Sequence, residues 1–73
     1  MKIKDFIGVL DANYRLNVGY ERVDKHGNLL FASLFVAYKE SRIWDNANLR
    51  EVYIKRIKLN SGGNCDIILV LKE

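Results

Sequence analysis

Residue types able to do chemistry are scarce in this chain of 73 residues, which has one histidine and one cysteine. His26 lies in the glycine-containing run 24–28, which predicts an exposed turn, whereas a general base needs a partner and a sheltered position. Cys65 has no base nearby in sequence that would activate a thiol nucleophile, so we predict a partly buried structural cysteine. Metal binding and disulfide-linked dimerisation are its alternatives, but one histidine and one cysteine cannot complete the usual four-ligand zinc site within one chain.

The carboxylates and glycines give no stronger signal. Asp24, Asp45 and Asp66 are scattered, and no pair has the defined spacing that acid–base or two-metal chemistry needs. The turn Ser61–Asn64 is glycine-rich but lacks the lysine and the following helix of a phosphate-binding loop. We therefore expect no catalytic, cofactor-binding or metal-binding residues, and expect that the protein is not an enzyme.

A small basic cluster is formed by Lys55, Arg56 and Lys58, with Tyr53 beside it. Basic side chains interleaved with an aromatic one can bind single-stranded nucleic acid by stacking and phosphate contact. In a regular strand Lys55 and Arg56 point to opposite faces, and a charged sheet edge that resists association explains the same residues. A basic protein-binding surface is the third interpretation. The net charge of +3 permits an acidic partner without requiring one.

Composition limits the class of protein. The chain is long enough for one domain, residues 1–73, and its 49% of hydrophobic residues is enough for a core. A single cysteine allows no internal disulfide, so a domain this small depends on good packing or on self-association. No apolar run is long enough to span a membrane. Charges within the first ten residues are not typical of a secretory signal, and a lone cysteine favours a cytoplasmic protein.

The hydrophobic period changes within the first twenty residues. Apolar side chains recur at three- and four-residue steps at Ile3, Phe6, Ile7 and Leu10, and at two-residue steps at Tyr14, Leu16, Val18 and Tyr20. We predict a helix over 4–11 that ends near Asn13, and then a strand over 14–23 with a bulge near Gly19 or Arg22. A turn over 24–28, with a positive φ at Gly27 or Asn28, leads to a strand over 29–39.

The second half predicts another hairpin. For residues 40–51 we expect either a short helix over 46–52, with Asp45 as its N-cap, or a loop with one helical turn. A strand over 52–59 changes phase between Ile54 and Ile57, which indicates a bulge, and a turn then leads to a strand over 65–72. The predicted fold is α+β: a four-stranded antiparallel sheet of two hairpins, with the N-terminal helix packed on one face.

Two of these strands, Leu29–Tyr38 and Cys65–Leu71, are apolar on both faces. Such a strand is either central and covered on both sides, or covered on one side and committed to a partner on the other. We predict a protein partner, either a second copy in a homodimer or a host effector. The predicted contact residues are Phe31, Phe35 and Trp44, with Tyr53, Lys55 and Arg56 at the rim. For Trp44 the alternative is a side chain that closes one end of the core.

Met1–Leu10, MKIKDFIGVL, and the closing run DIILVLK resemble a loosely related set of small proteins from phages and mobile elements of low-GC bacteria. Those proteins often begin Met-Lys-Ile-Lys-Asp-Leu, where this chain has Phe6. Some small phage proteins with a similar helix-plus-sheet order are anti-CRISPR inhibitors. The resemblance implies a non-enzymatic accessory protein that binds a host effector, such as a defence nuclease, stoichiometrically in the bacterial cytoplasm. The positive net charge argues against DNA mimicry. A small nucleic-acid-binding module that uses the basic cluster is the alternative.

Overall fold

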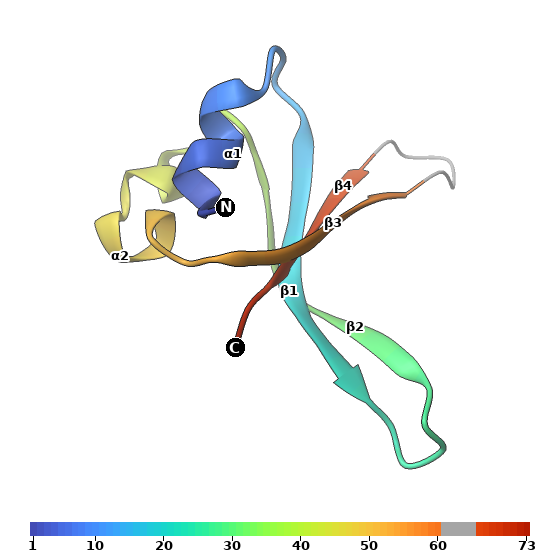
Figure 1. Cartoon of the computed structure of the whole chain (residues 1–73). Coiled ribbons are helices and arrows are strands. Elements are labelled where there is room, and N and C mark those ends of the chain that lie inside the picture. The colour runs from blue at the N-terminus through green and yellow to red at the C-terminus, as the bar shows by residue number, and fades with distance from the viewer. Residues whose placement is uncertain (61–65) are drawn as a thin grey trace.

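The computed structural model describes residues 1–60 and 66–73 (Figure 1). The elements, in chain order, are α1 (Ile3–Val9), β1 (Arg15–Val23), β2 (Leu29–Tyr38), the 3-10 helix η1 (Arg42–Asp45), α2 (Ala47–Arg50), β3 (Ile54–Asn60) and β4 (Asp66–Leu71). The prediction of a small α+β protein with a short N-terminal helix and four strands is confirmed. The predicted turn Ser61–Asn64 and Cys65 lie outside the described residues.

The four strands form one sheet in the order β2-β1-β4-β3. Both predicted hairpins are present, since β1 pairs with β2 and β3 with β4 in antiparallel fashion. The prediction of a purely antiparallel sheet is wrong, because β1 and β4 are parallel neighbours, with Leu16 opposite Ile67 and Gly19 opposite Val70. Parallel neighbours need a long connection. Here the segment with η1 and α2 carries the chain from β2 at one edge to β3 at the other.

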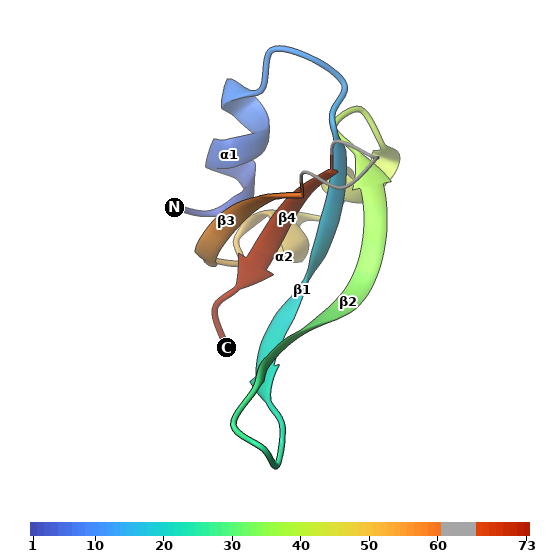
Figure 2. The same cartoon turned by 90° about the vertical axis from the view of Figure 1, so that its right-hand side faces the viewer.

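Within residues 1–60 and 66–73, helices cover one face of the sheet and leave the other without a helix (Figures 1 and 2). The apolar side of α1 lies on that face, where Ile3 is fully buried and Phe6, Ile7 and Leu10 pack against the core. The helix ends at Val9, earlier than predicted, and Leu10 is already extended. Asn13 does not end the helix, because its side-chain oxygen accepts a hydrogen bond from the Glu40 N–H at 3.0 Å. We call the uncovered side the helix-free face.

The first residues also extend the sheet. The N–H of Ile3 donates to the Val52 carbonyl at 2.9 Å, the Met1 carbonyl accepts from the Ile54 N–H at 2.8 Å, and Lys2 forms an isolated antiparallel bridge with Tyr53. This short pairing covers the outer edge of the chain where β3 begins. The same residues therefore start the helix and protect a strand.

The segment between β2 and β3 closes one end of the core. Trp44 of η1 is buried, its ring centroid lies 5.8 Å from that of Phe35, and its indole N–H donates to the Tyr38 carbonyl at 2.7 Å. The predicted short helix is present as α2, but Asp45 is not its N-cap. The side chain of Asn46 accepts from the N–H groups of Asn48 and Leu49 instead, which satisfies two otherwise unpaired helix donors.

Bulges interrupt both hairpins near their predicted positions. Between β1 and β2 the register shifts after Val18, which leaves Leu34 as the extra residue opposite Gly19 and its neighbour. A Cβ at Gly19 would lie 2.1 Å from the Ala32 carbonyl oxygen, so only glycine allows β2 to pass this closely. In β3 the register shifts between Ile54 and Arg56, which makes Lys55 the extra residue. The positive φ predicted for the first turn is at Gly27, with φ 82°.

Candidate protein-binding surface on strand β2

Strand β2 is an edge strand that leaves large apolar side chains exposed. Leu34, Val36 and Tyr38 are 57%, 45% and 50% exposed, and we call these three residues the β2 patch. Val36 and Tyr38 lie on the helix-free face, because they pair with Asn17 and Arg15 rather than with core residues. No charged residue occurs in the whole of β2. A run of exposed apolar side chains on an uncovered strand is typical of a protein-binding surface.

The aromatic residues predicted to contact a partner are placed differently. Phe35 packs on Trp44 within the core face, so the alternative for Trp44, a side chain that closes the core, is the one the burial supports. Phe31 is half-buried on the helix-free face, opposite Glu21. The exposed apolar side chains in this half of β2 are Leu34, Val36 and Tyr38, none of which is among the six predicted contact residues.

The bulge explains that difference. Strict alternation puts Leu30, Leu34 and Val36 on one face of the strand. Leu34 is an extra residue, so Leu30 pairs with Arg22 on the helix-covered side while Val36 pairs with Asn17 on the helix-free side. The bulge predicted near Gly19 was the available signal, because a bulge reverses the facing of every residue beyond it.

The predicted rim residues lie at the opposite edge of the sheet, on and next to β3. Tyr53 is exposed, and the Lys2 ammonium lies 5.5 Å from its ring centroid. Arg56 lies on the helix-free face opposite Val70. In the strand order, β1 and β4 separate this edge from β2. The six predicted residues thus form two groups, not one patch with a rim.

Glu21 is the residue at that edge which the sequence analysis missed. Its side chain is only 1% exposed, and it reaches from β1 across to β3, where its two oxygens meet Lys58 Nζ at 2.6 Å and Arg56 Nε at 3.1 Å. The hydrogen bond from Lys58 lowers the pKa of Glu21, and the neighbouring Arg56 lowers it further, against the effect of burial. We call these three residues the Glu21 clasp. Its single carboxylate offsets one of the two positive charges of Arg56 and Lys58.

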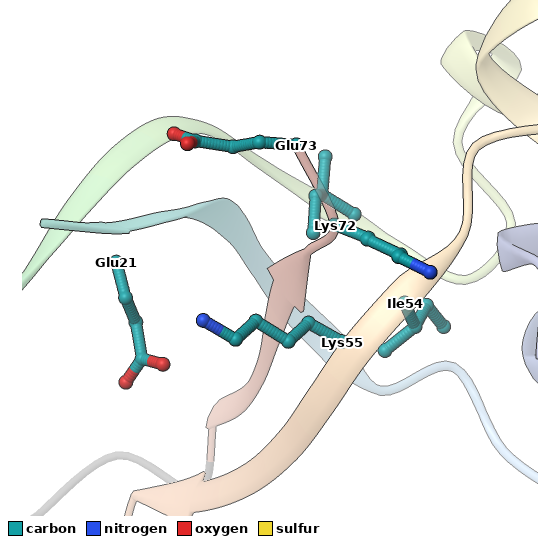
Figure 3. Close-up of a pocket in the computed structure, with 6 residues that line it drawn as sticks. Glu21, Ile54, Lys55, Lys72 and Glu73 are labelled. Carbon is teal, nitrogen blue, oxygen red and sulfur yellow. The ribbon is translucent and has the colours of Figure 1, made fainter.

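A pocket of about 510 Å³ lies beside the Glu21 clasp, between the ends of β1, β3 and β4 (Figure 3). Its charged lining residues are Glu21, Lys55, Lys72 and Glu73. Figure 3 shows Lys55 directed toward Glu21, while Lys72 points the other way. Two of these side chains are positive and two are negative.

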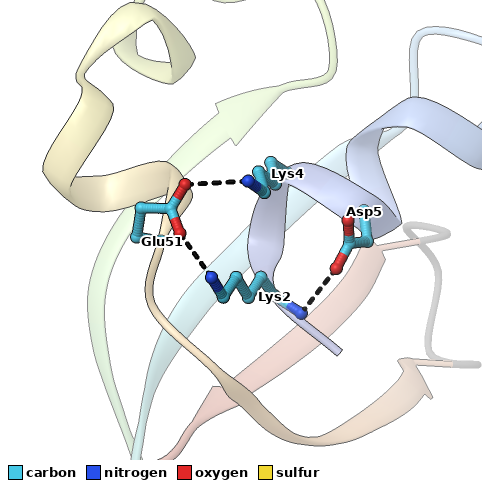
Figure 4. A network of polar contacts seen from close by, with 4 residues as sticks. All are labelled: Lys2, Lys4, Asp5 and Glu51. Atoms are coloured by element: carbon cyan, nitrogen blue, oxygen red, sulfur yellow. Dashed lines mark hydrogen bonds and ion pairs between the residues drawn. The ribbon is translucent and has the colours of Figure 1, made fainter.

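A second ionic network ties the start of α1 to the end of α2 (Figure 4). Glu51 accepts from Lys2 Nζ at 2.6 Å and from Lys4 Nζ at 2.9 Å, and the Lys2 N–H donates to the Asp5 carboxylate at 3.2 Å. The hydrogen bonds from Lys2 and Lys4 lower the pKa of Glu51 from 4.5 to about 2. This network holds the covering segment, residues 1–3, against the beginning of β3.

In residues 1–60 and 66–73, no group of three or more His, Cys, Asp or Glu side chains is placed to hold a metal ion. Within the same residues, no helix is long and apolar enough to cross a membrane. Comparisons with family models, curated proteins and solved structures find no match to this chain.

Proposed function

We propose that this chain is a non-enzymatic accessory protein that acts by binding another protein stoichiometrically through the β2 patch. The resemblance to small phage and mobile-element proteins suggests the partner, a host defence nuclease such as a CRISPR effector, met in the bacterial cytoplasm. Binding would block the nuclease by occupying part of its surface.

The observation that carries the proposal is the exposure of Leu34, Val36 and Tyr38 on a strand without charge. Scattered exposed apolar residues are ordinary on a protein surface, but three at alternate positions of a single strand are not. Tyr38 adds an aromatic ring of the kind that is enriched among residues dominating binding energy.

The nucleic-acid alternative has weaker support. Arg56 and Lys58, two of the three basic residues that suggested it, are paired with the buried carboxylate of Glu21. A phosphate would have to compete with that carboxylate for both cations. Binding through phosphates would also weaken steeply with salt, so a mobility shift with single-stranded DNA at two salt concentrations tests the alternative directly.

Val36→Lys tests the proposed binding surface. The variant places a charge in the β2 patch, and Val9→Lys makes the same change at an exposed position on α1 as a control. We expect the wild type and the Val9→Lys variant to co-elute at equimolar ratio with a nuclease from a panel of purified CRISPR effectors, and to inhibit its DNA cleavage. Val36→Lys should weaken that binding about thirtyfold, as expected for losing a well-packed anchor.

Two results would contradict the proposal. In the first, the wild type binds no nuclease of the panel and protects no phage from restriction in CRISPR-bearing cells. In the second, Val36→Lys and Val9→Lys bind the nuclease equally well. Circular dichroism of both variants shows whether a lost complex reflects a lost fold.

A further inference from the structure

The first half of β2 leaves its outer backbone edge without partners. In an antiparallel pair, hydrogen-bonded and non-bonded residue pairs alternate. Asp24 and Asn28 form a hydrogen-bonded pair, because the Asp24 N–H donates to the Asn28 carbonyl at 2.9 Å. Counting along the β1–β2 hairpin from this pair, the non-bonded pairs are those of Leu29, Phe31 and Ser33 with β1. The N–H and C=O groups of these three β2 residues therefore point away from β1, and in the described part of the chain no hydrogen bond reaches them.

The other end of the same edge is treated differently. The N–H of Tyr38 donates to Ser41 Oγ at 2.9 Å, and its carbonyl accepts from both the Ser41 N–H and the Trp44 indole. The chain thus caps the outward groups of β2 next to η1 but not those of residues 29–33. We call residues 29–33 the open edge.

The open edge also belongs to the least supported part of the sheet. The pairing of β1 with β4 ends at Gly19, so among the described strands residues 20–23 of β1 pair through their backbone with β2 alone. In both views this end of the hairpin projects from the rest of the molecule (Figures 1 and 2). A two-stranded ribbon is marginally stable in water and gains from a third strand.

We infer that a second copy of this chain supplies that strand, by antiparallel pairing of the two open edges around a two-fold axis at Phe31. Phe31 then lies opposite the partner's Phe31, Leu29 opposite the partner's Ser33, and Leu30 opposite the partner's Ala32. All outward N–H and C=O groups of Leu29, Phe31 and Ser33 are satisfied. The inference does not use the β2 patch, so it stands or falls separately from the proposed function.

Three observations favour this symmetric pairing of two copies. The open edge has no charge, so self-pairing sets no like charges opposite one another. The bulge at Leu34 ends the regular edge, and the remaining five residues pair symmetrically, which closes the assembly at two chains. If the open edge paired instead with β3 of another copy, each chain would keep a free edge and further chains could add without limit. The start of the β3 edge is also already paired with residues 1–3.

The surface area points the same way. The chain exposes 5117 Å², whereas a compact monomer of 8.5 kDa is expected to expose about 4,700 Å². The surplus of about 400 Å² is roughly half of what one partner buries in a standard interface. We therefore expect a small interface and a dimer whose population rises with concentration.

Sedimentation of the full chain at increasing concentration tests the inference. The mass should rise from 8.5 kDa toward twice that value. Phe31→Lys sets two like charges opposite each other at the two-fold axis and should return the mass to that of one chain, while Val9→Lys should leave the dimer intact. Circular dichroism of Phe31→Lys shows that it is folded.

Amide hydrogen exchange of the wild type identifies the interface without any substitution. The outward amides of Leu29, Phe31 and Ser33 should become protected as concentration rises, and those of Leu30 and Ala32, which face β1, should change much less. A mass that stays at one chain up to millimolar concentration overturns the inference. A dimer whose outward amides remain unprotected overturns it as well, because the two copies then meet elsewhere.

Discussion

The two edges of the sheet are protected in opposite ways. The β3 edge is covered at its start by residues 1–3, carries Lys55, Arg56 and Lys58, and is pinned through Glu21 to β1. The β2 edge has no charge, and only its end near Tyr38 is capped. Natural proteins commonly blunt sheet edges with charges or covering segments. The contrast is that charge and a covering segment shield the β3 edge from pairing with other strands, whereas the described residues provide neither for the first half of β2.

Trp44→Ala should have the largest effect, because it removes both the cover of Phe35 and the cap on the Tyr38 carbonyl. We expect a loss of about 4 kcal/mol in the free energy of unfolding, as for other buried tryptophans. Trp44→Phe keeps an aromatic ring but not the N–H donor, and should cost about 1 kcal/mol. Urea denaturation of the three proteins separates packing from capping. Equal losses in the two variants would mean that the hydrogen bond, not the ring, holds this end of β2.

Glu21→Gln tests the β3 edge and should have a smaller effect. The substitution leaves Arg56 and Lys58 without their shared carboxylate, so we expect a lower melting temperature. Because the folded state holds the pKa of Glu21 below its unfolded value, this contribution is present near neutral pH and lost on acidification. The difference in melting temperature between wild type and Glu21→Gln should therefore shrink as pH falls. Glu40→Gln, an exposed control, should show no such dependence.

Glu51→Gln should have the smallest effect, because Glu51 is half exposed. The unfolded chain protonates Glu51 near 4.5, whereas in the folded protein its pKa is about 2. Its contribution is complete above about pH 5 and disappears as pH falls toward about 2. Thermal melts of wild type and Glu51→Gln should differ at pH 6 and converge at pH 2. A constant difference would show that the network with Lys2 and Lys4 does not stabilise the cover on β3.

The sequence predicted the local elements well and their assembly less well. The periodicity of Ile3, Phe6 and Ile7 and that of Leu16 and Val18 reports which face each element buries, and the structure confirms both. Strand order is not a local property. The same two hairpins can meet through several pairs of edges, and only the length and path of the middle segment bring β4 against β1 in parallel.

For the candidate surface, the apolar character of the strand can be read from the sequence, but the exposure of each side chain cannot. An apolar excess in Leu29–Tyr38 is visible in composition, and the structure leaves part of it exposed. Which residues are exposed depends on the extra residue Leu34, whose position follows from the close passage of β2 over Gly19. Glu21 could not have been selected, because a single outward carboxylate does not reveal that it will meet two cations from a distant strand.

The position of β4 between β1 and β3 has a consequence for how the chain is made. β4 is the last of the four strands to leave the ribosome, yet the other three cannot join into one sheet until it inserts. Until then the hairpin of β1 and β2 exposes two backbone edges: that of β1, where β4 later pairs, and that of β2. Contacts between residues so far apart in sequence form slowly. The growing chain is therefore most exposed to aggregation and to chaperones before its closing strand has been translated.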